Sequence, residues 1–203
     1  ISPDIRRLGP TLADLKKSND VAIYVSKRAQ SAFDSFKLPG NIEYNQVMRP
    51  FYDALYRRNI EADVISPDGN ADLSKYKMIV VPALYSASDE EIARLNAFAE
   101  AGAHLVYTFK SGFSNEDTKV RYASQPGAIA QAAGVNYQLF TEPKGVKIGS
   151  ELYGLSGKEL EARWWMEFLK PTTATVIARF EHHSWPNYAA ITRNSYGKGE
   201  VTY

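Results

Sequence analysis

The sequence predicts an α/β domain in which a mostly parallel β-sheet lies between layers of helices. Three observations support this prediction. Short apolar runs alternate with helical segments between residues 21 and 109, which is the pattern of strand–helix–strand crossovers. The apolar runs are nearly continuous, as expected of parallel strands buried on both faces. Segments 174–180, 188–193 and 200–203 are typical of closing strands that pair antiparallel in part.

The elements of the first half follow from apolar periodicity. A helix is expected over 4–17, because Ile5, Leu8, Leu12 and Leu15 share one face, and Pro10 is expected to break it. A polar loop is expected over 26–42. A second helix is expected over 43–58, interrupted and kinked by Pro50. The expected strands are 21–25, 62–65, 78–82 and 104–109.

A third helix is expected to begin after Ser88 and to end at Gly102. Ser88 is a good N-cap, and Glu91 stands three residues on, where it closes a capping box. Residues 72–76 are expected to form one short helical turn.

The second half is less regular. The remaining segments are a polar loop over 110–125, a helix over 126–133 ended by Gly134, a strand over 135–139, a Gly-punctuated hairpin over 145–155, and residues 159–169, which fit either a strand or a helix.

Composition bounds the possible partners. The 203 residues are 44% hydrophobic, and 24 Lys and Arg nearly balance 23 Asp and Glu. This charge gives no reason to expect nucleic acid or an anionic membrane. No window approaches the roughly 18 apolar residues of a membrane span. Cysteine is absent, which excludes disulfides, thiolate metal sites and a cysteine nucleophile and is compatible with the cytoplasm, the expected location.

Ligands of open parallel sheets bind at the carboxyl ends of strands, so the loops there are the places to search. The segment after Val25 has no Gly-rich turn, and neither a dinucleotide fingerprint nor a P-loop occurs in the chain. A flavodoxin-like small-molecule module is therefore a disfavoured alternative, and no cofactor is expected.

The loop after Phe109 occupies the place where class I glutamine amidotransferases carry a nucleophile elbow. Lys110 and Ser111 stand there in place of cysteine, and Ser111 lacks the glycine spacing of a tight elbow. A serine nucleophile also needs a base, and His104 lies inside the preceding strand. The pattern indicates an amidotransferase-like fold without its chemistry. A free-standing amidotransferase-like hydrolase that uses Ser111 remains an alternative.

Other conspicuous clusters have ordinary explanations. His182 and His183 are adjacent, so on a strand they would point to opposite faces and could not share a metal; no metal site is expected. We interpret this segment as a polar turn whose Trp185 packs against the body. Trp164 and Trp165 could stack on a sugar, but the favoured interpretation places one in the core and the other under a neighbouring domain.

Glycoside hydrolysis needs two suitably spaced carboxylates. The pairs Glu90–Glu91 and Glu116–Asp117 are better explained as helix capping and solvated charge, so no catalytic residue is assigned.

Six segments together make the chain resemble the middle domain of family 42 β-galactosidases. They are 21–26 (VAIYVS), 50–56 (PFYDALY), 76–85 (YKMIVVPALY), 102–112 (GAHLVYTFKSG), 125–127 (QPG) and 192–199 (TRNSYGKG). Ala103 departs from the pattern, because a second glycine is common there. The resemblance extends from about residue 5 to 203.

The resemblance implies a domain with an amidotransferase-like fold that mediates trimer formation. In the chain it would follow a catalytic (β/α)₈ barrel and precede a small β-sandwich. It implies a parent enzyme that hydrolyses terminal β-D-galactosides with retention, using two glutamates of the barrel. Residues 1–18 would be a helical lead-in from the barrel and 19–203 a single domain, with both ends read as cuts in a longer chain.

By the same resemblance, the loop over 110–122 is a candidate edge of the parent's active site. The candidate edge or interface residues are Phe109, Lys110, Phe113, Asn115, Trp165, His183 and Trp185.

Overall fold

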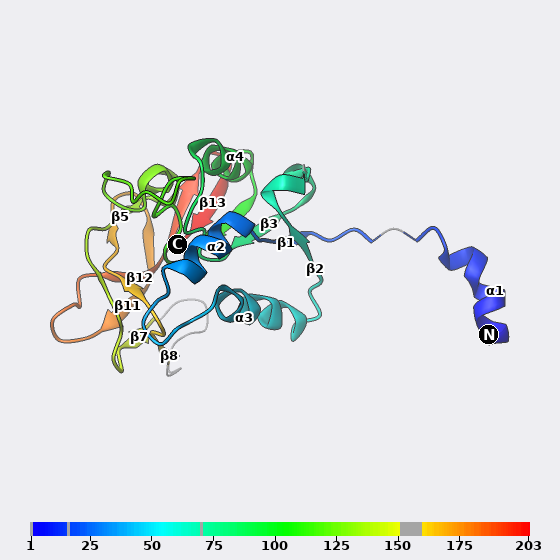
Figure 1. The fold of residues 1–203 in the computed structure, drawn as a ribbon, viewed down its shortest axis with the longest axis horizontal. Helices are drawn as coiled ribbons and strands as arrows, with labels where there is room; N and C mark the ends of the chain where they lie inside the picture. The colour runs from blue at the N-terminus through cyan, green and yellow to red at the C-terminus, as the bar shows by residue number, and fades with distance from the viewer. Residues whose placement is uncertain (1, 16, 70, 151–159) are drawn as a thin grey trace.

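A computed structural model describes residues 2–15, 17–69, 71–150 and 160–203. Its centre is a nine-stranded mixed sheet of order β2-β1-β3-β4-β13-β12-β11-β7-β8 (Figure 1). The described residues form five α-helices, and none of them is both long and apolar enough to cross a bilayer. The predicted α/β architecture with a mostly parallel first half is confirmed at this level.

Five strands form the parallel half of the sheet, and each pairs in parallel with its neighbours there. In sheet order they are β2 (Ala62–Ile65), β1 (Val21–Tyr24), β3 (Met78–Val81), β4 (His104–Tyr107) and β13 (Gly199–Thr202). Hydrophobic side chains fill β1 and β3 on both faces, because helices cover both sides.

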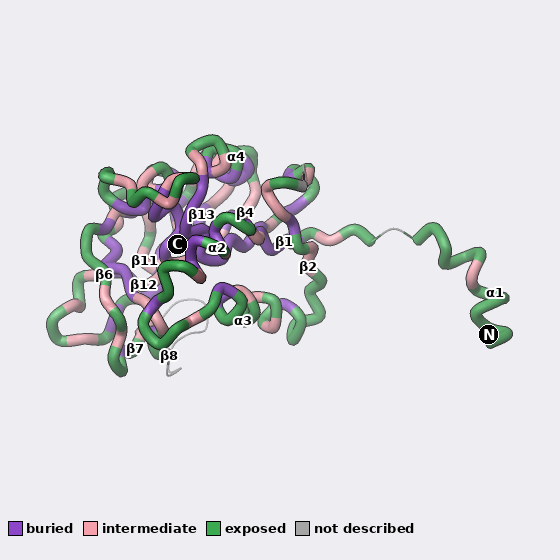
Figure 2. The backbone as a smooth tube through the Cα atoms, in the orientation of Figure 1, coloured by how far each residue is buried: buried purple, intermediate pink, exposed green. Residues whose placement is uncertain are grey.

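Helices α2 (Lys27–Ser35) and α3 (Tyr44–Tyr56) lie on one side of the parallel half, and α4 (Asp89–Glu100) lies on the other (Figure 1). Alternation along β1 divides its side chains accordingly. Ile23 packs in a cluster with Leu55 of α3, whereas Ala22 belongs to the large cluster that includes Leu95 of α4. Figure 2 shows this buried layer running through the sheet, with exposed backbone around it.

An antiparallel meander completes the sheet beyond β13. Its strands are β12 (Ala189–Tyr196), β11 (Thr175–Glu181), β7 (Lys147–Gly149) and β8 (Leu160–Glu161). Two small sheets lie beside it. They pair β5 (Val135–Asn136) with β10 (Lys170–Pro171), and β6 (Phe140–Thr141) with β9 (Met166–Glu167).

The predicted loop over 26–42 is wrong, because it contains α2. Ser26 caps this helix by accepting a hydrogen bond from the Ala29 backbone N–H. Ala29, Ala32 and Phe33 are spaced on one face and are buried, while Lys, Arg, Gln and Asp fill the rest. Two of the three buried residues are alanines, so the apolar face is easily overlooked.

Helix α1 (Pro3–Leu12) stands apart from the rest of the chain (Figure 1). None of its residues is buried, and its apolar residues Ile5, Leu8 and Leu12 face solvent. The predicted break at Pro10 is wrong: the helix continues through it, because a missing N–H in the final turn removes only one hydrogen bond. Helix α3, the other expected helix that contains a proline, also continues without a break through Pro50.

Other boundaries are shorter than expected or composite. The helix expected over 126–133 is a 3₁₀ turn (Gly127–Ile129) followed by α5 (Ala130–Ala133), and Gly134 ends it in the left-handed conformation, as predicted. Two more 3₁₀ turns occur at Pro67–Gly69 and Leu73–Lys75. Part of the hairpin expected over 145–155 lies outside the described residues.

Candidate functional site

The loops that follow the carboxyl ends of β3 and β4 are joined by hydrogen bonds at the position of the expected elbow. Ala83, which follows β3, has φ 37°, and Lys110, which follows β4, has φ 62°. The Ala83 N–H donates to the Thr108 hydroxyl over 2.7 Å, and the Leu84 N–H donates to the Ser111 hydroxyl over 3.2 Å. Two backbone donors that an amidotransferase-like site would need for an oxyanion are therefore already used within the chain.

Ser111 has no access to a substrate. It is completely buried, and its hydroxyl accepts the Leu84 N–H. His104 lies at the start of β4, where its Nε2 is 2.8 Å from the Thr202 hydroxyl oxygen. The elbow thus contains neither an exposed nucleophile nor a base beside it, so the geometry does not support a serine hydrolase at this position.

Lys110 occupies the elbow, and its ammonium lies among four aromatic rings. Its Nζ is 3.7 Å from the ring centre of Phe113, 4.0 Å from Trp165, 4.8 Å from Phe140 and 5.6 Å from Tyr85. We call these five residues the Lys110 cage. Burial lowers the pKa of Lys110 to about 8, and the nearby Glu167 carboxylate opposes that shift. The rings favour the charged form through cation–π attraction.

Glu167 ties the elbow to three other strands. It is buried, and its Oε1 accepts the Lys110 N–H over 2.9 Å and the Tyr137 hydroxyl over 2.8 Å. Its Oε2 accepts the Tyr203 hydroxyl over 2.9 Å. Burial raises the pKa of Glu167, while the hydrogen bonds from Lys110, Tyr137 and Tyr203 oppose the shift. This carboxylate therefore joins the ends of β4, β5, β9 and β13.

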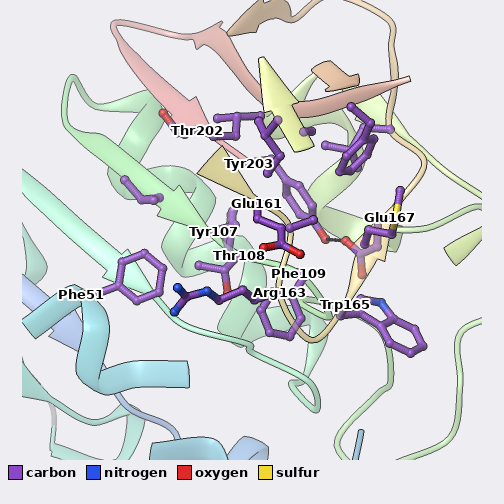
Figure 3. A pocket seen from close by; sticks show the side chains of 18 residues that line it. Phe51, Tyr107, Thr108, Phe109, Glu161, Arg163, Trp165, Glu167, Thr202 and Tyr203 are labelled. Carbon is purple, nitrogen blue, oxygen red and sulfur yellow. Dashed lines mark hydrogen bonds between the residues drawn. The ribbon is translucent and has the colours of Figure 1, made fainter. Parts of the chain in front are cut away.

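A cavity of about 370 Å³ opens beside this network (Figure 3). Phe109 and Trp165 line it, together with Glu161 and Arg163, and Figure 3 shows Tyr203 and Glu167 joined by their hydrogen bond at its wall. Two carboxylates thus border one cavity, as glycoside hydrolysis requires. Glu167, however, is enclosed and engaged by three donors, so it is not free to act as acid or nucleophile.

The structure divides the predicted site residues into two groups. Phe109, Lys110, Phe113 and Trp165 lie together around the elbow. Asn115 follows them and organises the next turn, because its side-chain oxygen accepts the N–H groups of Asp117 and Lys119.

His183 and Trp185 lie elsewhere, on the connection between β11 and β12. Trp185 packs against Phe168 with ring centres 5.1 Å apart, and His182 stacks on Trp185 at 3.9 Å. The predicted packing of Trp185 against the body is confirmed. In the described part of the chain no group of three or more His, Asp or Glu is arranged to hold a metal ion.

The sequence reasoning missed the residues that complete the elbow. Tyr85, Phe140 and Glu167 come from three separate segments, so no local spacing connects them. One signal was present: Glu167 is a lone charge within the apolar run from Trp164 to Leu169, and such a charge requires partners when buried.

The carboxylate pairs also differ in detail from expectation. Ser88 caps α4 through the Glu91 N–H, as predicted. The Glu91 side chain instead accepts the Tyr24 hydroxyl over 3.0 Å and lies 3.8 Å from Arg28, so it serves the helix–sheet contact. Glu116 and Asp117 are exposed, as expected of solvated charge.

Comparison with known proteins places the chain in a family. The family model described as "Beta-galactosidase trimerisation domain" matches residues 19–203. Beta-galactosidase BgaA of Clostridium cellulovorans is 30% identical over 200 residues, covering 98% of this chain and 30% of the relative. Beta-galactosidase BgaB of a Geobacillus species is 30% identical over 169 residues, covering 83% of this chain and 25% of the relative.

Solved structures agree. The β-galactosidase of Bacillus circulans sp. alkalophilus superposes with a TM-score of 0.88 at 26% identity, covering 98% of this chain and 30% of that one. The enzyme of Rahnella sp. R3 gives 0.85 at 25% identity, covering 98% and 31%. The chain spans about 30% of the length of these proteins. It belongs to the family of β-galactosidase trimerisation domains, which occurs in glycoside hydrolase family 42.

Proposed function

We propose that this chain is the domain through which a larger β-galactosidase assembles into a homotrimer, while another part of the same polypeptide hydrolyses terminal β-D-galactosides with retention. The match of residues 19–203 to the trimerisation domain carries the proposal. The closed elbow supports it, because Ser111 is buried and Glu167 is fully engaged. These two groups form hydrogen bonds inside the domain and are not available to a substrate.

Expression of the full-length protein and of residues 1–203 alone tests this proposal. The full-length protein should hydrolyse a nitrophenyl β-galactoside and give the mass of a trimer in light scattering, whereas the isolated chain should be inactive. A full-length protein that is active as a monomer would contradict the assembly function. Hydrolysis of the galactoside, or of an amide, by the isolated chain would contradict the non-catalytic role.

We also propose that residues 1–18 lead in from a catalytic barrel and that a β-sandwich follows residue 203. Helix α1 supports the first part, because it lies outside the matched range and exposes Ile5, Leu8 and Leu12. An apolar helical face of this kind is stable only when another element covers it. Limited proteolysis of the full-length protein should spare α1; rapid cleavage within it would count against the arrangement.

We infer that the finer fold class is flavodoxin-like and amidotransferase-like, with three layers. The order β2-β1-β3-β4-β13 supports this inference, because it corresponds to the 2-1-3-4-5 order of flavodoxin-like sheets. The left-handed Lys110, three residues after the end of β4, supports it too, since that is the elbow position. A crystal structure with a different strand order would contradict it.

We propose that the loop over 110–122 borders the active site in the assembled enzyme. Phe113 and Asn115 have internal contacts, so exposed Glu116 and Val120 are better probes. Substitution of these two by Ser should raise the galactoside KM without changing thermal stability; an unchanged KM would count against the idea. The expected cytoplasmic location stays a prediction, which fractionation of the source cells would test.

A further inference from the structure

Exposed apolar side chains continue outward from the Lys110 cage. Phe36 is 59% exposed and stacks on Tyr85 with ring centres 6.3 Å apart. Phe140 is 41% exposed and stacks on Trp165 at 4.8 Å, and its neighbour Leu139 is 59% exposed. We call Phe36, Leu139 and Phe140 the apolar rim.

The rim and the cage form one continuous row of rings. Tyr85 contacts Phe113 at 5.5 Å, and Phe113 contacts Phe140 at 5.8 Å, which joins Phe36 at one end to Trp165 at the other. Its rings come from the end of α2, the loop after β3, the elbow and β6. These segments are separate in the sequence, so only folding brings the rings together. Contiguous exposed apolar surface of this kind marks an interaction site.

The ammonium of Lys110 lacks a hydrogen-bond acceptor within the part of the chain that the structure describes. The aromatic rings compensate part of the cost of burying a cation. They provide no acceptor for its three N–H groups. Glu167 attracts the charge, but it accepts the Lys110 backbone N–H. Solvent or a partner can supply the acceptor.

We infer that the Lys110 cage and its apolar rim bind a second copy of this chain, with Lys110 Nζ donating to an oxygen, preferably a carboxylate, of that copy. This inference rests on the proposed assembly function. It names the surface and the anchor through which assembly occurs.

Three features favour a second copy of this chain over other binding partners. Aromatic side chains around a cation, bordered by exposed apolar residues, match the composition of interface hot spots. A cation as anchor calls for an acidic partner, and the chain has exposed carboxylates such as Glu116. A three-fold ring uses two different surfaces of each subunit, so the cage of one copy meets another surface of the next. The family match supplies the second copy.

The test is Lys110→Met in the full-length enzyme, because methionine keeps an unbranched apolar stem and removes the ammonium. Sedimentation velocity over a dilution series gives the subunit dissociation constant. Loss of a charged hydrogen bond at an interface should weaken assembly about tenfold to a hundredfold. The dissociation constant of the wild type should also change little with salt, because the pair of Lys110 and the partner's oxygen is enclosed at the interface.

Lys119→Met is the matched control. Lys119 is exposed, follows the same elbow and pairs with Asp117 over 3.3 Å, outside the cage and rim. This variant should assemble as the wild type does. Leu139→Ser provides a second variant for the case in which Lys110→Met unfolds, since Leu139 is largely exposed and lies outside the cage. It should weaken assembly while leaving the melting temperature of the diluted subunit unchanged.

Amine labelling gives an independent readout. Reductive methylation with formaldehyde and cyanoborohydride, followed by peptide mass spectrometry, should modify Lys110 slowly in the assembled enzyme and faster after dissociation. Equal rates in both states, or wild-type dissociation constants for both Lys110→Met and Leu139→Ser, would overturn the inference. A wild-type enzyme that is monomeric at every concentration would refute the proposed assembly function itself.

Discussion

Glu167 is the residue whose replacement should most damage this domain. Replacement by Leu keeps a side chain of similar size but removes both acceptor oxygens. Three buried donors then lose their partner: the Lys110 N–H and the hydroxyls of Tyr137 and Tyr203. Each unsatisfied buried donor costs about 1–3 kcal/mol. Removal of a buried charge recovers part of that cost, so the expected loss of unfolding free energy is about 3–5 kcal/mol.

Glu167→Gln is the informative comparison. Its amide oxygen can still accept two donors, while its NH₂ group faces the Tyr203 hydroxyl, which can turn to accept. The expected loss is about 1–2 kcal/mol, since most of the network survives. Urea unfolding followed by tryptophan fluorescence measures both variants, because Trp165 lies beside the network. Equal losses for Leu and Gln, or a loss below about 1 kcal/mol for Leu, would refute the reasoning.

The pH dependence provides a second readout. Burial raises the pKa of Glu167 above its usual value near 4.5. The folded chain therefore keeps this proton at pH values where the unfolded chain has lost it. The stability that protonated Glu167 contributes is fully present below the unfolded-state pKa and is lost as pH rises through the folded-state pKa. The unfolding free energy of wild type relative to Glu167→Gln should fall above about pH 4.5, by at most about 1.4 kcal/mol per pH unit.

Three further predictions concern the core and the elbow. Leu105→Ala, at a fully buried position of β4, should lower the unfolding free energy by about 2–5 kcal/mol in urea titrations, and a loss below about 1 kcal/mol would show the site less tightly packed than described. Ser111→Ala should lower the unfolding free energy by about 1–3 kcal/mol, because the buried Leu84 N–H loses its acceptor. The full-length variant should hydrolyse a galactoside with the wild-type kcat, and loss of kcat would indicate that Ser111 is catalytic. Gly112→Ala should lower the melting temperature by several degrees, since Gly112 has φ +70° and a Cβ would lie 2.7 Å from the Pro126 carbonyl oxygen; an unchanged melting temperature would contradict this.

The elements that the sequence predicted well are those with a strong local pattern. Strands 21–25 and 78–82 are apolar on both faces, so their burial is visible in any window of a few residues. Ser88 and Gly134 mark helix ends through their own side-chain and backbone chemistry. Helix α2 was missed because two of its three buried residues are alanines among charged and polar neighbours.

The candidate site was predicted only in part, because its parts are distant in sequence. Residues 109–113 follow a recognisable strand, so the elbow was a natural place to search. Lys110, Trp165 and Trp185 were predicted as members of one set of candidate edge or interface residues. Only the structure shows that Trp165 contacts Lys110 and that Trp185 lies elsewhere.

The sequence by itself determined an α/β domain with a parallel first half, the absence of thiol chemistry, and the likeness to a β-galactosidase domain, because these depend on composition, local periodicity and ordered motifs. Only the tertiary structure decided what the elbow does. It buries Ser111, gives Glu167 three donors and surrounds the Lys110 ammonium with four rings. The physical reason is that buried charges and hydroxyls take their roles from the partners that folding brings to them, and those partners come from strands far apart in the chain.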